Sequence, residues 1–331
     1  MPLWIVILLA YLFEFANGWT DAPNSIATVV STRVLRPFVA VLMAAVLNLA
    51  GALAGTAVAH TIASGIVNPD YVSLETIAAA LLAATVWALG AQYFGLPSSE
   101  SHALISGLLG AGFAAGGLEA LGWSGTRKAL IGLVTSPVGG FIAGFILMVL
   151  IYRLFRRTRR SRVSRIFGRA QVFSAAFMAF SHGTNDAQKT MGIIALAIAI
   201  NAAAPGEPVP DEIVIENWVI VSAAMVIALG TMIGGWRVIR TIGMRMTHLE
   251  PVQGFAAETG AATVITAAAH FGIPVSTTHA IGTSIMGVGS TKRFSAVRWG
   301  VAGQVVSGWI LTWPSCMVMG FVMGKFLNAA F

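Results

Sequence analysis

The sequence carries very little charge. Only 10% of its 331 residues are Asp, Glu, Lys or Arg, whereas about a quarter of the residues in a soluble domain are charged. Cysteine is almost missing too, and the single Cys316 excludes an internal disulfide. Long polar stretches are also absent, so we expect no separate soluble domain.

Apolar sequence is abundant instead. The chain is 56% hydrophobic, and apolar runs recur along its length, each about 20 residues long and able to cross a bilayer core of roughly 30 Å. This pattern predicts an all-α polytopic membrane protein that lies in the lipid bilayer of the cell membrane. The predicted segments are 2–32, 37–60, 73–94, 98–116, 127–152, 170–201, 216–235, 253–271, 277–290 and 297–324.

The positive charge is concentrated in one place. The formal net charge is +7, and eight arginines lie between Arg153 and Arg169. Lys and Arg are enriched in the cytoplasmic loops of membrane proteins. We therefore predict that 153–169 is a basic cytoplasmic linker and that the N-terminus lies outside. Because the cytoplasmic loop accounts for the arginines, we expect no nucleic-acid partner.

Two similar polar motifs interrupt apolar sequence. The first reads Gly18-Trp-Thr-Asp-Ala-Pro-Asn-Ser25, and the second reads Gly183-Thr-Asn-Asp-Ala-Gln-Lys-Thr190. They align Asp21 with Asp186. Carboxylates and helix-breaking residues at membrane depth are costly unless they line a cavity or bind something. We therefore predict helix breaks at 17–23 and 182–189.

A second pair of motifs follows in the same order. Phe94-Gly-Leu-Pro-Ser-Ser-Glu-Ser-His-Ala103 aligns with Phe271-Gly-Ile-Pro-Val-Ser-Thr-Thr-His-Ala280. The segments on either side of each motif form two spans or a re-entrant hairpin. Each half contains an odd number of crossings, so the second half enters the membrane from the opposite side.

These matches predict two inverted-topology repeats with broken transmembrane helices and re-entrant hairpins. Residues 1–152 would form the first transmembrane repeat, and residues 170–331 would form the second, inverted one. The acidic stretch 202–217 is expected to be a solvated connector.

The second motif pair is suited to an anion. Each motif starts a helix after a Gly-x-Pro sequence, and the first N–H groups of a helix are unpaired at its positive dipole end. These hydroxyls could be ordinary N-caps, but their symmetric occurrence favours binding of a tetrahedral oxyanion. The substrate-binding candidates are Ser98, Ser99, Ser101, Ser276, Thr277 and Thr278, together with Asn24, Gln188, Lys189 and Thr190.

Asp21 and Asp186 suit a cation, because carboxylates hold a metal ion or a proton. A polar contact between helices is the alternative for this pair. Anion-binding helix ends beside such carboxylates predict a cation-coupled anion symporter. The coupling candidates are Asp21, Asp186, Asn185, Thr20, Glu258 and Glu14.

Beyond H⁺ or Na⁺ at Asp21 and Asp186, we expect no metal and no cofactor. Lys189 could contact the anion or neutralise Asp186. The roles of His102, His279 and Glu100 are left open by the sequence.

At these residues the sequence resembles the inorganic phosphate transporter (PiT) family, whose signature Gly-x-Asn-Asp-x-x-x-(Ser/Thr) occurs twice. The family also has paired Pro-x-Ser-(Ser/Thr)-x-His loops. The second signature and Pro274–His279 match closely, whereas Thr20 and Pro23 depart from the first signature and Glu100 departs from the first loop. The resemblance implies a secondary active transporter, not an enzyme, that takes up inorganic phosphate by symport with H⁺ or Na⁺.

Inverted repeats also predict alternating access to a central site. Sulfate or a metal–phosphate complex is the alternative cargo, and an anion channel is the alternative mechanism. The Gly-x-Gly-Asp and Tyr-Asp contexts of an intramembrane aspartyl protease are missing. A homodimer is common among such transporters.

Overall fold

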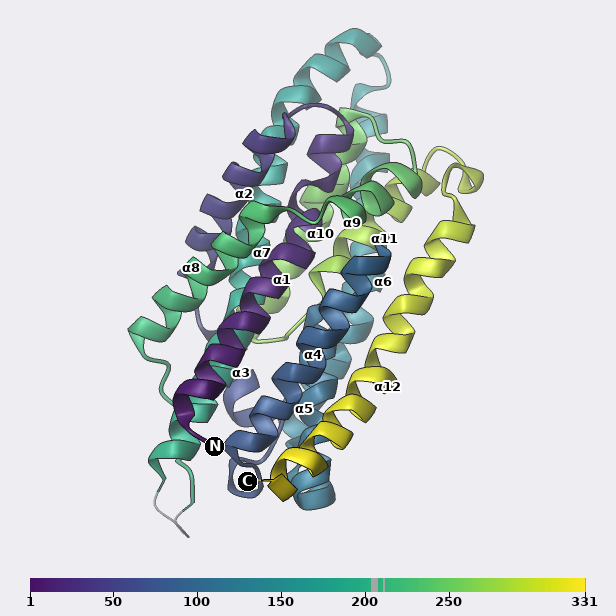
Figure 1. Cartoon of the computed structure of the whole chain (residues 1–331). Helices are drawn as coiled ribbons and strands as arrows, with labels where there is room; N and C mark the ends of the chain where they lie inside the picture. Colours follow the sequence, from purple (N-terminus) through teal and green to yellow (C-terminus); the bar gives the residue numbers. More distant parts are fainter. Residues whose placement is uncertain (204–207, 211, 331) are drawn as a thin grey trace.

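The computed structural model describes residues 1–203, 208–210 and 212–330, which fold almost entirely into helices (Figure 1). A π-helical turn, Thr241–Arg245, follows α9 directly. The α-helices of the described residues are α1 Leu3–Ser31, α2 Pro37–Ala52, α3 Ala57–Gly65, α4 Leu74–Phe94, α5 Glu100–Gly116, α6 Trp123–Phe155, α7 Arg160–Ala202, α8 Asn217–Ile233, α9 Trp236–Arg240, α10 Pro251–His270, α11 Thr277–Ser290 and α12 Trp299–Ala330.

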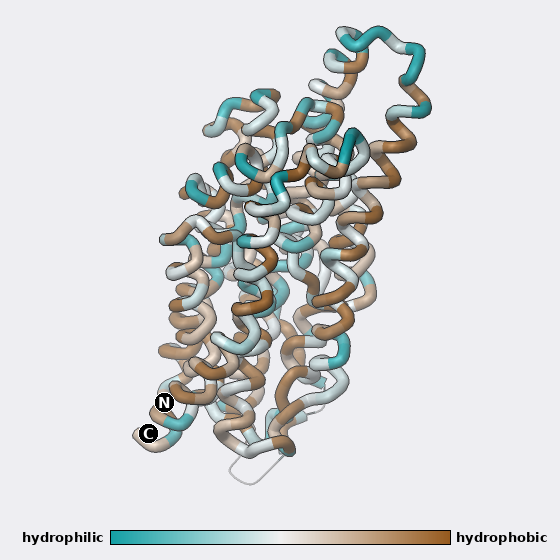
Figure 2. The backbone as a smooth tube through the Cα atoms, turned by 90° about the vertical axis from the view of Figure 1, so that its right-hand side faces the viewer, coloured by the Kyte–Doolittle hydropathy of each residue, from teal (hydrophilic) through white to brown (hydrophobic). Residues whose placement is uncertain are grey.

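The helices have the length and composition of membrane spans. Among the described residues, five are long and apolar enough to cross a membrane, and up to seven spans result if each of two bent helix pairs is counted as one. Figure 2 shows hydrophobic residues along the long helices and hydrophilic ones at the turn between α6 and α7. The protein is therefore a multi-pass membrane protein, as the sequence predicted.

The helix breaks do not lie where the sequence placed them. The prediction of breaks at 17–23 and 182–189 is wrong, because α1 and α7 run continuously through both motifs. The bends occur between α2 and α3, at 66°, and between α8 and the turn formed by α9 and Thr241–Arg245, at 61°. The arginine-rich 153–169 segment is also more helical than expected, since α7 already begins at Arg160. Part of the expected connector at 202–217 lies outside the described residues.

Each bend packs against the motif of the other half. At the α8–α9 bend, a Cβ on Gly235 would lie 2.8 Å from Cγ of Pro23 on α1, so only glycine fits there. At the α2–α3 bend, Gln188 on α7 accepts a hydrogen bond from the Val58 backbone N–H at 2.7 Å. Pro23 and Gln188 occupy equivalent positions in the two aligned motifs. The motifs thus support bends in neighbouring helices instead of bending themselves.

The two halves of the chain interlock. Helix α1 packs on α8, and α7 packs on α2. The close approach uses equivalent glycines: a Cβ on Gly51 would lie 2.1 Å from the Phe180 carbonyl oxygen, and one on Gly230 would lie 2.3 Å from that of Phe15. Matching glycines at matching contacts support the inverted repeats and show that each repeat completes the packing of the other.

The expected hairpins are formed by α4 with α5 and by α10 with α11 (Figure 1). At 1.5 Å per residue, α5 and α11 are only about 26 and 21 Å long. The length of α11 is well below the bilayer core of roughly 30 Å, which favours a re-entrant hairpin there. Helix α5 is extended by a 3₁₀ turn, Gly117–Ala120, and Glu100–Ala120 as a whole is one of the five helices counted above. In Figure 1, the two returning helices start near the middle of the molecule and run to opposite ends.

The buried apolar side chains form two separate clusters. Helix α1 contributes Val6 and Phe13 to one cluster and Ile26 and Val29 to the other. Asp21 lies between these two sections of α1. The polar residues of the motifs are therefore enclosed between two apolar layers, at mid-length of the long helices.

The glycine contacts give a direct test of the interlocked packing. Gly51→Ala should lower stability by about 1–3 kcal/mol, because the added methyl group meets a backbone carbonyl that cannot move aside. Gly90→Ala in α4 is the matched control: nothing lies within 4 Å of a Cβ there, and alanine should add about 0.5–1 kcal/mol through helix propensity. Thermal unfolding in detergent, followed by circular dichroism, measures both. Equal changes in the unfolding temperature of the two variants would contradict the close packing of α2 on α7.

Candidate functional site

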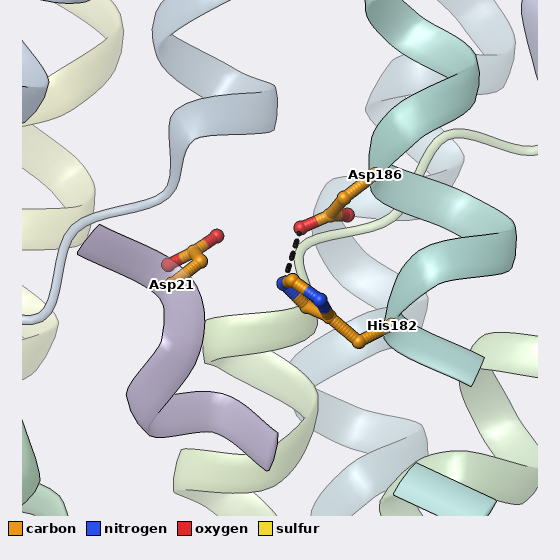
Figure 3. A group of neighbouring side chains, drawn as sticks. All are labelled: Asp21, His182 and Asp186. Carbon is orange, nitrogen blue, oxygen red and sulfur yellow. Dashed lines mark ion pairs between the residues drawn. The ribbon is translucent and has the colours of Figure 1, made fainter. Parts of the chain in front are cut away.

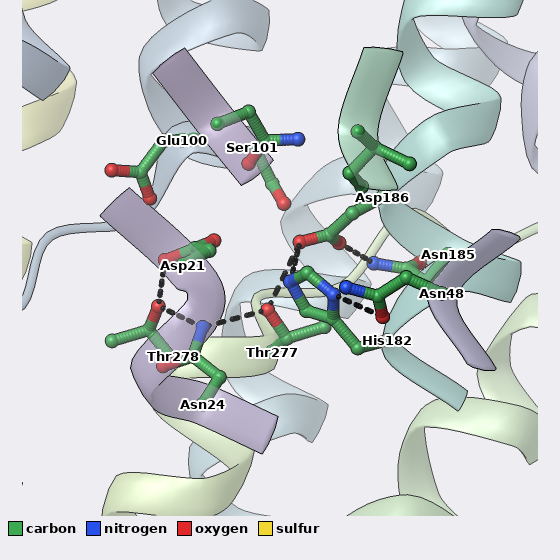
Figure 4. Close-up of polar contacts among 12 residues, drawn as sticks. Asp21, Asn24, Asn48, Glu100, Ser101, His182, Asn185, Asp186, Thr277 and Thr278 are labelled. Carbon is green, nitrogen blue, oxygen red and sulfur yellow. Dashed lines mark hydrogen bonds and ion pairs between the residues drawn. The ribbon is translucent and has the colours of Figure 1, made fainter. Parts of the chain in front are cut away.

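Polar side chains from four helices meet at the centre of the protein (Figure 4). They come from the middles of α1 and α7 and from the N-terminal ends of α5 and α11. Asp21 is 4% exposed, and Asp186 and Lys189 are 0% exposed. Because these groups are buried away from solvent, their charges must be balanced by other members of the cluster or by bound ions.

The two hairpin helices begin at this cluster. Their first turns are capped in the same way: the Ser99 hydroxyl accepts from the His102 backbone N–H at 3.3 Å, and the Ser276 hydroxyl accepts from that of His279 at 3.1 Å. The two histidine rings are 4.7 Å apart between centroids. Ser99 and Ser276 are therefore N-caps here, and the positive ends of both helices converge on one point.

The hydroxyls at the start of α11 join the two aspartates. Thr278 donates to Asp21 Oδ1 at 3.0 Å, and Thr277 donates to Asp186 Oδ2 at 3.1 Å. The Asn24 amide donates to both threonines, at 3.1 and 2.9 Å. Five of the residues predicted from the sequence thus form one continuous network between α1, α11 and α7.

Asp186 is fully supplied with donors. Oδ1 accepts from the Asn185 amide at 2.7 Å and from the Lys189 ammonium. Oδ2 accepts from Thr277 and lies 3.0 Å from His182 Nε2. The Lys189 ammonium contacts Asp186, and a direct role of Lys189 in binding the anion stays a prediction. Its other hydrogen bond goes to the Ser101 hydroxyl on α5.

Asn185 fixes the tip of the second hairpin. Its amide group donates to the Val275 carbonyl at 2.9 Å, and its oxygen accepts from the Val275 N–H at 3.4 Å. Ser101 donates to the same carbonyl at 3.0 Å. The backbone just before α11 is thus bonded to both α7 and α5, which sets the position of its hydroxyls.

Asp21 has fewer partners than Asp186. Within the described part of the chain, its only hydrogen-bond donor is Thr278. Its carboxyl group also lies beside that of Glu100, at the start of α5 (Figure 4). Glu100 accepts from Thr20 at 2.8 Å and from Ser98 at 3.2 Å. The first half of the site therefore contains two carboxylates side by side.

Asp21, His182 and Asp186 could hold a cation together. One ligand atom from each lies within 4.8 Å of the others (Figure 3). His182 is not among the candidate residues predicted from the sequence. A helix places residues i and i+4 on one face, so the spacing of His182 and Asp186 could have indicated the contact. His182 is oriented by Asn48, whose Oδ1 is 3.0 Å from His182 Nδ1.

Four predicted residues lie outside this network. Gln188 caps the start of α3 and lines a hollow of about 280 Å³ that also includes Thr184 and His270. Thr190 donates to Glu14. Glu258 accepts hydrogen bonds from Ser174, Thr28 and Gln171 in a separate buried group. Roles for Gln188, Thr190, Glu14 and Glu258 in binding or coupling stay predictions.

Comparisons with known proteins identify a matching family profile and similar proteins. The profile described as "Phosphate transporter family" matches residues 17–320. A probable low-affinity inorganic phosphate transporter of Rhizobium meliloti is 45% identical, with 95% of this chain and 93% of the relative covered. A protein of the same description from Bacillus subtilis is 40% identical, with 99% and 97% covered.

A solved structure, described as the sodium-dependent phosphate transporter, is similar with a TM-score of 0.89. It is 25% identical in sequence, and 99% of each chain is covered.

The unequal surroundings of the two aspartates predict unequal stability effects. Asp186→Asn should destabilise by about 3–5 kcal/mol, because it leaves a buried ammonium without its counter-charge. Asp21→Asn should cost less than about 1.5 kcal/mol, since the asparagine oxygen can still accept from Thr278. Thermal unfolding of the purified variants measures the difference. Adding Lys189→Met to Asp186→Asn should recover part of the loss; identical unfolding temperatures for the two aspartate variants would contradict the charge pairing.

Proposed function

The chain belongs to the phosphate transporter family, and we propose that it takes up inorganic phosphate by symport with H⁺ or Na⁺. It is a transporter and not an enzyme. The observation that carries the proposal is the meeting of two helix N-termini and two buried aspartates in one network. This arrangement offers donors to an anion and acceptors to a cation within a few ångströms.

The anion would bind where α5 and α11 begin. Helix N-termini present free N–H groups and a positive dipole end, both of which favour phosphate. The hydroxyls of Ser101, Thr277 and Thr278 lie at these ends and can reorient to donate. Ser99 and Ser276, which cap the helices, would act on the anion indirectly, by holding the helix ends in place.

The cation would bind at the aspartates. Asp21 lies beside Glu100, and two neighbouring buried carboxylates repel each other unless a proton or a metal ion lies between them. The structural relative described as sodium-dependent makes Na⁺ a candidate, and H⁺ is the other. A bound cation would relieve the repulsion and lower the electrostatic cost of admitting phosphate.

Alternating access would expose this site to each side in turn. All residues of the network are nearly inaccessible to solvent, so a conformational change must open it. The two hairpins contact each other through Ser101 and the Val275 carbonyl. A rocking motion of the inverted repeats would break such contacts on one side and keep them on the other.

Uptake into proteoliposomes tests the proposal. Radiolabelled phosphate and sulfate would be compared under a proton gradient, a sodium gradient or neither. We expect phosphate to accumulate under one cation gradient and not without it. Asp21→Asn should abolish this accumulation, whereas Asp70→Asn, at an exposed position, should not change it. Equilibration of phosphate without any gradient would indicate a channel, and accumulation of sulfate alone would refute phosphate as the cargo.

The orientation is part of the proposal and has its own test. The arginines between α6 and α7 would lie in the cytoplasm, with the N-terminus outside. A cysteine introduced by Arg160→Cys should react with a membrane-impermeant maleimide only in inverted membrane vesicles, while Asp70→Cys should react in intact cells. Cys316 is buried and should stay unlabelled. The opposite pattern would reverse the orientation. The homodimer expected from the resemblance stays a prediction.

A further inference from the structure

The two halves of the site are equivalent in position but not in charge. Asn24 and Lys189 hold the same place in the two motifs, and Thr278 and Ser101 hold the same place in the two hairpins. The structure keeps this equivalence: the Asn24 amide donates to the Thr278 hydroxyl, and the Lys189 ammonium donates to the Ser101 hydroxyl. One half therefore has a neutral amide where the other has a positive charge.

The positive charge of Lys189 pairs with the carboxylate of Asp186. Lys189 donates to Asp186 on its own helix, three residues away. Asn24 is the residue equivalent to Lys189, and within the described part of the chain it makes no hydrogen bond to Asp21. Asp186 thus has a charged partner in addition to its neutral donors Asn185 and Thr277, whereas Asp21, within the described residues, accepts from Thr278 alone. The positive charge of Lys189 weakens the attraction of Asp186 for a cation, so a cation held between Asp21, His182 and Asp186 would depend mainly on the charge of Asp21.

We propose that the Lys189 ammonium takes the place of one co-transported cation, leaving Asp21 as the carboxylate that binds the cation that moves. This inference rests on the proposed symport function and refines it. Lys189 is covalently part of α7 and is 0% exposed, so its charge stays in the protein through every cycle. The site would thus balance phosphate with one fixed and one mobile positive charge on its two aspartates.

The fixed charge has a measurable consequence for coupling. A cation that crosses the membrane with phosphate adds its gradient to the driving force, but a tethered ammonium adds nothing. Replacing Lys189 by the asparagine found at the equivalent position should open Asp186 to a second mobile cation. The number of cations carried per phosphate should then increase by one.

The experiment uses the full chain in proteoliposomes. The phosphate gradient at which net flux is zero, measured at several imposed cation gradients with the membrane potential held at zero, gives the number of cations per phosphate. We expect Lys189→Asn to carry one more cation than the unchanged protein. Lys189→Arg keeps the positive charge and should leave the number unchanged. Lys128→Asn removes a lysine that donates to Thr61 instead, and it should also leave the number unchanged.

Two outcomes would overturn the proposal. An unchanged number of cations in Lys189→Asn would show that Asp186 accepts no mobile cation. A raised KM for phosphate with an unchanged number would show that Lys189 acts on the anion directly.

A second measurement tests the proposal even if Lys189→Asn does not transport phosphate. Thermal unfolding in detergent would be compared in sodium chloride and in choline chloride. We expect sodium to stabilise Lys189→Asn more than it stabilises the unchanged protein, because the freed Asp186 can bind it. Equal stabilisation of both proteins by sodium, together with the same dependence of unfolding temperature on pH, would refute the proposal that Lys189 takes the place of a cation. If the unchanged protein accumulates no phosphate under any gradient, the symport proposal fails, while this comparison still tests whether Lys189 occupies a cation site.

Discussion

The balance of buried charge is the constraint on which the structure depends. Three carboxylates, Asp21, Glu100 and Asp186, share the centre of the protein with one ammonium, Lys189, and all four are almost fully buried. Isolated charges of this kind cost several kcal/mol each even after relaxation. Phosphate would add further negative charge to a site already rich in carboxylates. It can therefore enter at low cost only together with a positive charge, and this gives a physical reason for coupling an anion to a cation.

The hairpins explain how such a site can also be mobile. Helices α5 and α11 present their positive ends to the centre, but each end is fixed by only a few side-chain bonds. The tip before α11 depends on Asn185 and Ser101 through one residue, Val275. Bonds of this type contribute about 0.5–1.5 kcal/mol each. Binding of a substrate that replaces a few of them can therefore shift the position of a hairpin, whereas the glycine-packed contacts of α1 with α8 and of α7 with α2 would stay.

Much of this arrangement could be read from the sequence, because it depends on residue type and order. The duplicated motifs predicted two inverted repeats and brought Asp21, Asn24, Asp186, Thr277 and Thr278 together. The helix breaks could not be placed correctly, since Gly18 and Pro23 look like breakers when only their own helix is considered. Their effect lies in neighbouring helices: Pro23 faces Gly235 at a bend of α8. The Gly234–Gly235 pair was the local signal for that bend. The partners of Gln188 and Glu14 depend on contacts across the fold that no motif spacing contains.

Departures from symmetry carry information that the repeats themselves do not. Duplication would give two equal halves, each with an aspartate, an amide and hydroxyls. This chain has Glu100 where the other half has Thr277, and Lys189 where the other half has Asn24. Glu100 adds a negative charge to one half, and Lys189 adds a positive charge to the other. The total charge therefore equals that of a symmetric site, but the charge is distributed unequally between the two halves. In the proposed symport, the negative half would take up and release a cation, while the charge of the other half is already balanced by Lys189. Each mobile cation with a tenfold gradient contributes about 1.4 kcal/mol to accumulation. A fixed ammonium therefore preserves the electrostatic balance that phosphate needs, at the loss of one such contribution per cycle.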